Sequence, residues 1–180
     1  MAGVDRLARW RVPAGFACGV AVLWLAAPTR LTLAAGVTVA AAGEALRLWA
    51  AGHLNKSREV TSSGPYRWVA HPLYVGSSVM GAGLAIASGS VSVAIVVAVY
   101  LGVMITAAIR SEEAFLRRAF PERYDRYRRG AESAGDREAG ARRFTWAQAR
   151  ANHEPRSVAG LAAAVLLLVL KAVYDGVLAR

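Results

Sequence analysis

The stretch VSVAIVVAVYLGVMITAAI, residues 91–109, decides the fold class of this chain. Its 19 residues carry no charge, and a helix of that length measures about 28 Å, close to the roughly 30 Å hydrocarbon core of a bilayer. Four further apolar stretches lie outward from it, at residues 12–27, 31–52, 72–88 and 158–174, with charges gathered between them. In a chain that is 56% hydrophobic and 19% charged, this segregation predicts an all-α, polytopic membrane helix bundle with about five transmembrane helices.

The basic residues predict how these spans are oriented. Twelve of the 22 Lys and Arg residues lie between Arg110 and Arg156, and none lies in the turn at residues 89–90. Because basic loops stay in the cytoplasm, we expect a cytoplasmic N-terminus and an outer C-terminus, with the bacterial inner membrane as the location. The start of the chain also resembles a signal peptide, with Arg6, Arg9 and Arg11 before an apolar stretch that ends near Ala27. The later spans favour an uncleaved first membrane helix. No nucleic-acid-reading motif accompanies the charge, so we expect no nucleic-acid partner.

The long polar stretch that follows the fourth span is ordered rather than random. One apolar stripe recurs in it at spacings of four, four and three, formed by Leu116, Phe120, Tyr124 and Tyr127. This spacing predicts an amphipathic helix lying at the membrane surface, and Pro121 is expected to kink or restart it. Residues 130–143 (GAESAGDREAGARR) are small and charged, as is typical of a flexible linker. We interpret residues 1–180 as a single domain.

Two polar segments at the predicted cytoplasmic boundary are candidates for ligand binding. Gly64-Pro65 and His71-Pro72 each set a turn, and irregular backbone at a membrane boundary is tolerated only where it is buried in protein or lines a wet cavity. Glu112 and Glu113 form a pair of carboxylates that could accept hydrogen bonds from a cationic ligand. A structural interpretation stays open for each segment. The segment with the two turns could be an interfacial turn with an aromatic belt of Tyr66, Trp68 and Tyr74. The glutamate pair could belong to the start of a helix capped by Ser111.

Taken together, residues 64–66 (GPY), 71–76 (HPLYVG) and 112–127 (EEAFLRRAFPERYDRY) resemble the isoprenylcysteine carboxyl methyltransferase and phospholipid methyltransferase superfamily. Its members are membrane enzymes that transfer a methyl group from S-adenosylmethionine to a lipophilic acceptor. The resemblance therefore implies that activity, that cofactor and a membrane-dissolved, lipid-like substrate with a carboxylate, amine or hydroxyl group. It also implies a set of cofactor-binding residues, namely Gly64, Pro65, Tyr66, His71, Pro72, Tyr74, Gly76, Glu112 and Glu113.

The chain also shows one further match to the superfamily and one departure from it. In the phospholipid methyltransferase branch, a Gly-x-Gly in the span that follows His-Pro contacts the cofactor. In this chain the two glycines would be Gly81 and Gly83. Close packing of helices would explain these two glycines equally well. The superfamily usually has Arg before His-Pro, where this chain has Ala70. Arg67 would lie one turn from His71 if the segment were helical, and could then supply the missing charge.

Two further places could contact the methyl acceptor. Residues 150–156 (RANHEPR) enter the fifth span, and members of similar length resemble the chain there. Glu154 could orient the acceptor or take its proton, with Asn152 fixing its position, although a plain helix entry with Pro155 in the first turn fits as well. The second place is Glu44 and Arg47, three residues apart in the second span. They predict either a structural ion pair or a charged lining of the substrate path.

The same residues bear on other classes of function and ligand. The three histidines, at positions 53, 71 and 153, have no clustered spacing, so we expect no metal site. The alternatives to methyl transfer are an NADPH-dependent membrane reductase related to sterol reductases, and a non-catalytic membrane scaffold. Neither the acceptor nor the oligomeric state follows from the sequence.

Overall fold

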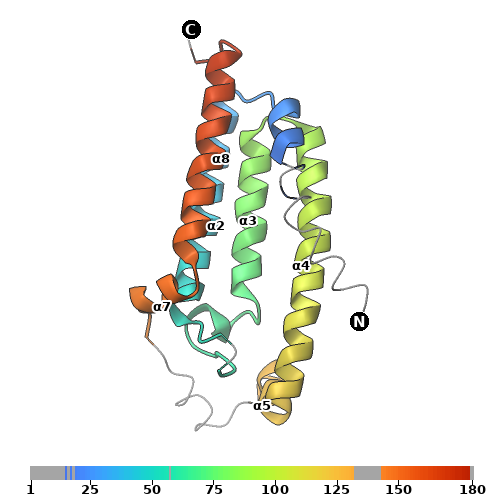
Figure 1. The fold of residues 1–180 in the computed structure, drawn as a ribbon, viewed down its shortest axis with the longest axis vertical. Coiled ribbons are helices and arrows are strands. Elements are labelled where there is room, and N and C mark those ends of the chain that lie inside the picture. Colours follow the sequence, from blue (N-terminus) through green and yellow to red (C-terminus); the bar gives the residue numbers. More distant parts are fainter. Residues whose placement is uncertain (1–14, 16, 18, 57, 132–142, 179–180) are drawn as a thin grey trace.

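A computed structural model describes residues 15, 17, 19–56, 58–131 and 143–178, and they form the all-α fold that the sequence predicts (Figure 1). The long helices α2 (Arg30–His53), α3 (Pro72–Ala87), α4 (Val91–Ala119) and α8 (Glu154–Tyr174) run along the long axis of the molecule. Three short helices gather at one end: η1 (Gly64–Arg67), α5 (Pro121–Arg128) and α7 (Trp146–Ala151). We call this end, with the segments that join the short helices to the long ones, the polar end.

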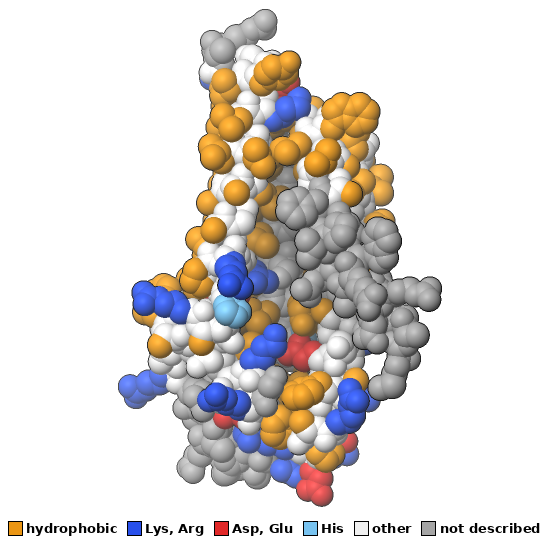
Figure 2. Space-filling view, viewed as in Figure 1, with side chains coloured by type: hydrophobic (Ala, Val, Ile, Leu, Met, Phe, Trp, Pro, Cys, Tyr) orange, Lys and Arg blue, Asp and Glu red, His pale blue; other side chains and the backbone are white. Residues whose placement is uncertain are grey.

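Among the described residues, three helices are long and apolar enough to cross a membrane: α2, α4 and α8. Helix α3 is apolar, but its 16 residues span only about 24 Å. The first of the five predicted spans lies partly outside the described residues, although its residues 19–25 are helical. On the face that Figure 2 shows, hydrophobic side chains cover the visible upper parts of the long helices, whereas most of the visible Lys, Arg, Asp and Glu side chains lie toward the polar end. The chain is an integral membrane protein, with three of its five predicted spans present as candidate spans.

Helices α2 and α3 touch backbone to backbone through glycines. A Cβ atom on Gly36 would lie 2.2 Å from a backbone nitrogen of α3, and one on Gly43 would lie 2.4 Å from another. In return, a Cβ on Gly83 would lie 2.3 Å from a backbone nitrogen of α2, and one on Gly81 would lie 2.2 Å from the Leu101 side chain of α4. Small residues allow this close approach, which holds helices together where lipid provides no hydrophobic force. Gly81 and Gly83 therefore serve helix packing in this fold.

Both ends of α2 are capped by side chains. At its start, the Thr29 Oγ1 accepts from the Thr32 backbone nitrogen at 3.1 Å, and the Thr32 Oγ1 accepts from the Thr29 nitrogen at 2.8 Å, a reciprocal capping box. At its other end, the Asn152 side-chain amide donates to the carbonyl oxygens of Ala51 and Leu54, both at 2.8 Å. The last carbonyls of a helix have no partner within it, so Asn152 fixes the end of α2 at the polar end.

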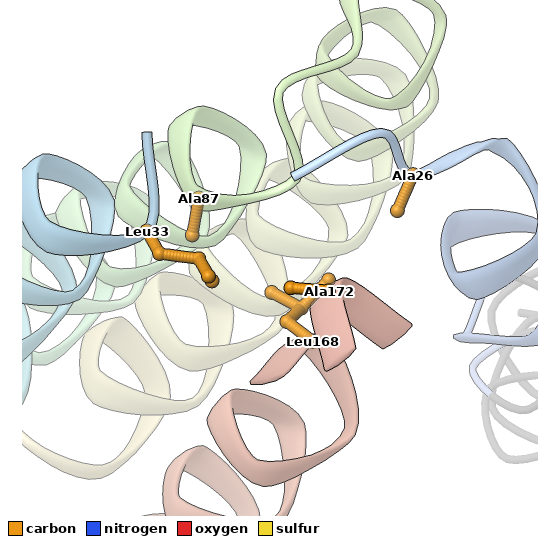
Figure 3. Close-up of a cluster of buried hydrophobic side chains, with 5 residues drawn as sticks. All are labelled: Ala26, Leu33, Ala87, Leu168 and Ala172. Carbon is orange, nitrogen blue, oxygen red and sulfur yellow. The ribbon is translucent and has the colours of Figure 1, made fainter. Parts of the chain in front are cut away.

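A cluster of buried hydrophobic side chains closes the bundle at the end opposite the polar end (Figure 3). It joins the segment before α2 with α2, α3 and α8, and consists of Ala26, Leu33, Ala87, Leu168 and Ala172. The adjacent turn between α3 and α4 is as tight as the sequence predicts. Its Gly89 has a φ of +64°, which glycine adopts without strain, and Ser90 caps α4 by accepting from the Val93 nitrogen at 3.4 Å.

Helix α4 is longer than the apolar pattern indicates. The predicted fourth span ends at Ile109, but the helix continues without interruption to Ala119. Residues 110–119 contain mainly Arg, Glu, Ala and Leu, which favour helix, and no Gly or Pro that would break it. The interpretation of Ser111 as the cap of a new helix is therefore wrong, because Ser111 lies inside α4.

The helix break falls at Pro121, where the sequence predicts a kink or restart. Helix α4 ends before Phe120, whose φ of −140° leaves the helical region, and α5 begins at Pro121. The predicted apolar stripe is thus divided, with Leu116 on α4 and Tyr124 on α5, instead of continuing along one helix. Of the predicted linker, residues 132–142 lie outside the described part of the chain.

Candidate functional site

Both predicted turns are present at the polar end. Gly64 begins η1 with a φ of +57°, a conformation that glycine adopts readily, and a Cβ there would lie 2.6 Å from the ring of His53. Pro65 occupies the first turn of η1. His71 lies outside the helical region, with a φ of −133° and a ψ of 61°, and precedes Pro72, which starts α3. Its ψ falls short of the extended geometry that the sequence predicts for a residue before proline. The segment between these turns is irregular, as predicted.

His71 lies between the two predicted carboxylates. Its Nδ1 is 3.6 Å from the Glu112 Oε2, and its Nε2 is 3.3 Å from the Glu113 Oε1. The histidine side chain is only 12% exposed. The Arg128 guanidinium of α5 adds a further positive group, with its Nη2 3.8 Å from the Glu113 Oε1. We call His71, Glu112, Glu113 and Arg128 the charged cluster; it joins the start of α3, the end of α4 and α5.

Tyrosines surround the charged cluster. The Tyr74 ring lies 5.8 Å from the His71 ring, centroid to centroid. Tyr66 is buried, and its carbonyl oxygen accepts a 2.7 Å hydrogen bond from the Tyr127 hydroxyl, which ties η1 to α5. Burial, together with the nearby Glu113 charge, raises the pKa of Tyr124 to about 12, and burial followed by the Glu112 charge raises the pKa of Tyr66 well above its usual range. Both phenols therefore stay protonated at neutral pH.

The predicted aromatic belt is only partly present. Trp68 is 73% exposed and can face the membrane interface, whereas Tyr66 is only 7% exposed and lies within reach of the Glu112 charge. Arg67 is exposed, and the residues between it and His71 form a turn rather than a helix. Arg67 therefore does not occupy the position one helical turn from His71 that the sequence suggested.

The charged cluster makes the stability of the fold depend on pH. The contact with Glu112 raises the pKa of His71 above 6.5, Glu113 adds to this shift, and burial opposes it. Because the pKa in the folded state exceeds that in the unfolded state, protonated His71 stabilises the fold at low pH. This contribution is lost as the pH rises through the raised pKa.

We therefore expect the thermal unfolding midpoint of the wild type to fall as the pH rises from about 6.5, and to fall less in a His71→Gln variant. Circular dichroism of the detergent-solubilised protein measures both midpoints. The same pH dependence in the two proteins would contradict a stabilising charge on His71.

Arg47 makes a second, more buried set of ionic contacts. The predicted pair is present, with the Arg47 Nε 3.6 Å from the Glu44 Oε2. The closer contact goes to Glu154, whose two carboxylate oxygens lie 2.9 Å and 3.2 Å from the Arg47 Nη2. Arg47 also donates to Ser77 and Ser157, and Ser157 donates to the Glu44 Oε2 at 2.8 Å. One guanidinium thus joins α2 to α3 and to the first turn of α8.

The predicted site residues fall into two groups. His71, Tyr74 and the two glutamates gather at the charged cluster, and Tyr66 lies within reach of the Glu112 charge. Gly64 lies against the His53 ring of α2. Gly76 instead lies against α2, where a Cβ would be 2.6 Å from the Arg47 Cγ. Glu154 is held by Arg47, as described above, and Asn152 by the end of α2. The sequence offered no signal for Arg128, while Tyr124 was indicated only by its place in the apolar stripe.

Residues 23–123, more than half of the chain, match the phospholipid methyltransferase family. The chain belongs to this family. The family is part of the integral membrane methyltransferase superfamily, so the resemblance noted in the sequence is confirmed. The matched part of this phospholipid methyltransferase family member runs from before α2 into α5. It includes His71, Glu112 and Glu113, and it excludes Asn152 and Glu154.

Two curated proteins are similar to the chain. The nickel-cobalt-cadmium resistance protein NccN of Alcaligenes xylosoxydans xylosoxydans is 39% identical over 108 residues, which cover 59% of this chain and 49% of that protein. The cobalt-zinc-cadmium resistance protein CzcN of Cupriavidus metallidurans is 40% identical over 98 residues, which cover 53% and 44%. The chain spans about half the length of the curated relatives it matches. No solved structure matches the chain. Among the described residues, no group of three or more His, Cys, Asp or Glu side chains could hold a metal ion.

Proposed function

We propose that this chain transfers a methyl group from S-adenosylmethionine to a lipophilic acceptor dissolved in the membrane. The main support is the position of His71 between Glu112 and Glu113, inside the part of the chain that matches the phospholipid methyltransferase family. A polar site at the end of an apolar helix bundle suits a reaction between a water-soluble cofactor and a lipid.

The charges of the cluster fit the proposed cofactor. S-adenosylmethionine carries an ammonium and a sulfonium group, and Glu112 and Glu113 are carboxylates that accept hydrogen bonds from cations. Arg128 and His71 can donate to a ligand carboxylate. In the superfamily an Arg usually stands before His-Pro for this role, at the position where this chain has Ala70. The turn at residues 64–66 and the Tyr74 ring would enclose the rest of the ligand. Bound there, the cofactor supplies an electrophilic methyl group on its sulfonium.

The residues of the chain would then act mainly by positioning the reactants and excluding water. The hydrogen bond from Tyr127 to Tyr66 ties α5 to η1, and Tyr124 of α5 is buried. A carboxylate acceptor is already ionised and needs no base. An amine or hydroxyl acceptor must lose a proton, for which His71 and Glu154 are the candidates. Glu154 would first have to release Arg47, while Asn152 would help position the acceptor through its remaining amide oxygen.

We also propose that the polar end faces the cytoplasm. Most of the basic residues that the structure describes lie at this end, and basic segments stay on the cytoplasmic side of membranes. The cofactor would then enter from the cytoplasm, and the acceptor from the bilayer.

Ligand titration tests the proposed function. Calorimetry of the full chain in mild detergent is expected to detect binding of S-adenosylmethionine and S-adenosylhomocysteine. Glu112→Gln and Glu113→Gln are each expected to weaken binding of S-adenosylmethionine by at least about tenfold, equivalent to about 1.4 kcal/mol, because each removes a charged hydrogen-bond acceptor. The matched control is Glu122→Gln on α5, whose side chain is 90% exposed and which is expected to bind as the wild type does.

Other outcomes of this titration would contradict the proposal. Binding of NADPH alone would favour the membrane reductase. A folded protein that binds none of the three ligands would favour a non-catalytic scaffold. Equal loss of binding in all three glutamate variants would mean that surface charge, and not the cluster, accounts for the affinity.

A further inference from the structure

A groove of about 750 Å³ lies along α3 and α4, separate from the charged cluster. Its walls include Ser78 and Ala82 of α3 and Ala98, Gly102 and Ile105 of α4. On α4 it extends from the first residue of the helix to Thr106, a length of about 22 Å. Its volume is within the roughly 300–1,000 Å³ that is usual for small-molecule sites in proteins.

The groove exists because the facing residues are small. A Cβ on Gly102 would have no neighbour within 4 Å, whereas one on Gly81 would touch the Leu101 side chain. Leu101 therefore closes the floor between the two helices, and the space above Gly102 stays open. Apart from a few hydroxyl groups, the lining is aliphatic. Because α4 is a candidate membrane span, the groove lies at the depth of the hydrocarbon core.

One end of the groove leads toward the charged cluster. On α3, Ser78 lies one turn from Tyr74, and its hydroxyl donates to the Tyr74 carbonyl oxygen at 3.0 Å. On α4, Thr106 precedes Glu112 by less than two turns, about 9 Å along the helix. The other end reaches the turn at residues 89–90, near the far end of the bundle. The apolar groove thus begins about 9 Å from Glu112 along α4 and extends from there toward the far end of the bundle.

We infer that this groove holds one hydrocarbon chain of the methyl acceptor, with the acceptor's polar group at the charged cluster. The inference rests on the proposed function, because it assigns the two ends of one amphiphilic molecule to two neighbouring parts of the structure. A lipid with a polar head and a long, unbranched chain matches both the polarity of the cluster and the length of the groove. Residues 98 and 102 then limit the thickness of the chain that the protein accepts.

Photolabelling of the full chain tests this inference without requiring methyl transfer. The probe is a phospholipid with a photoreactive diazirine in one acyl chain, added to the detergent-solubilised protein, and mass spectrometry maps the labelled peptides. We expect labelling to concentrate on residues 78–86 and 94–106. In Gly102→Phe this labelling is expected to fall by at least about tenfold, since the aromatic ring fills the groove and removes most of the apolar area available to the chain.

Gly160→Phe is the matched control. Gly160 is another exposed helical glycine of a candidate span with no neighbour within 4 Å of a built Cβ, but it lies on α8. This variant is expected to keep the labelling of α3 and α4 unchanged. Labelling spread evenly over the exposed faces of α4 and α8, and insensitive to Gly102→Phe, would overturn the inference. Native mass spectra that show a dimer lost only in Gly102→Phe would overturn it as well, because a second copy of the chain would then occupy the groove.

The experiment separates this inference from the proposed function. Groove labelling in a protein that fails to bind S-adenosylmethionine would contradict methyl transfer but leave a lipid-chain site. Cofactor binding without groove labelling would support methyl transfer and overturn the assignment of the groove to the acceptor.

Discussion

Replacing Gly36 by alanine is expected to destabilise the helix bundle by more than about 3 kcal/mol, because the added methyl group has no space. It would lie 2.2 Å from the backbone nitrogen of Ala87 and 2.5 Å from the carbonyl oxygen of Gly83. Both neighbours are backbone atoms of α3, so no side-chain rotation relieves the clash and the two helices must separate. Separation would also disturb the buried cluster that includes Leu33 and Ala87.

Thermal unfolding in detergent, followed by circular dichroism, measures this effect. Gly160→Ala is the control, because a Cβ at Gly160 meets nothing within 4 Å. In a helix, alanine is more stable than glycine by roughly 0.5–1 kcal/mol, so the control variant is expected to be slightly more stable than the wild type. If Gly36→Ala unfolds at the same temperature as Gly160→Ala, α2 and α3 do not pack backbone to backbone.

Removing the Arg47 guanidinium has the second large expected effect. In Arg47→Met, the Glu154 carboxylate, whose side chain is 2% exposed, loses its ionic partner inside the bundle. Breaking a buried ion pair from one side costs roughly 3–5 kcal/mol, because an uncompensated charge remains. The variant also loses the hydrogen bonds that join α2 to Ser77 and Ser157. We expect a cost of about 3 kcal/mol or more, measured by the same unfolding experiment.

Two further variants show whether the buried charge causes this loss. Arg47→Met combined with Glu154→Gln removes both charges and is expected to recover part of the stability. Arg126→Met breaks an exposed ion pair on α5, in which the Arg126 Nη1 lies 3.7 Å from the Glu122 Oε2, and is expected to cost less than about 1 kcal/mol. A double variant less stable than Arg47→Met would indicate that the lost hydrogen bonds, not the charge, dominate.

The local turns of the site could be predicted from the sequence because they depend on single residues. Proline at position 72 keeps His71 out of the helix, and proline at position 121 starts α5, since a proline ring restricts its own backbone and that of its neighbour. The end of α4 could not be located from hydropathy. The apolar stretch ends at Ile109, where the charged residues begin, whereas the helix continues to Ala119, just before Pro121.

The contacts of the charged residues required the tertiary structure. Glu44 and Arg47 are three residues apart, so their pairing follows from helix geometry alone. The closer contact of Arg47 with Glu154 joins two helices more than a hundred residues apart in the chain, and no local spacing encodes it. The same holds for Asn152, whose type suited a catalytic role but whose amide caps the end of α2.

The sequence by itself determined the helical membrane class, the positions of the turns and the family motifs, because each depends on local composition or on a short run of residues. Only the tertiary structure decided which motif residues meet. It places His71 between two carboxylates from α4, brings Arg128 to the same cluster, and assigns Gly76, Gly81 and Gly83 to helix contacts. The physical reason is that these contacts depend on the relative placement of whole helices, which many packed side chains set together.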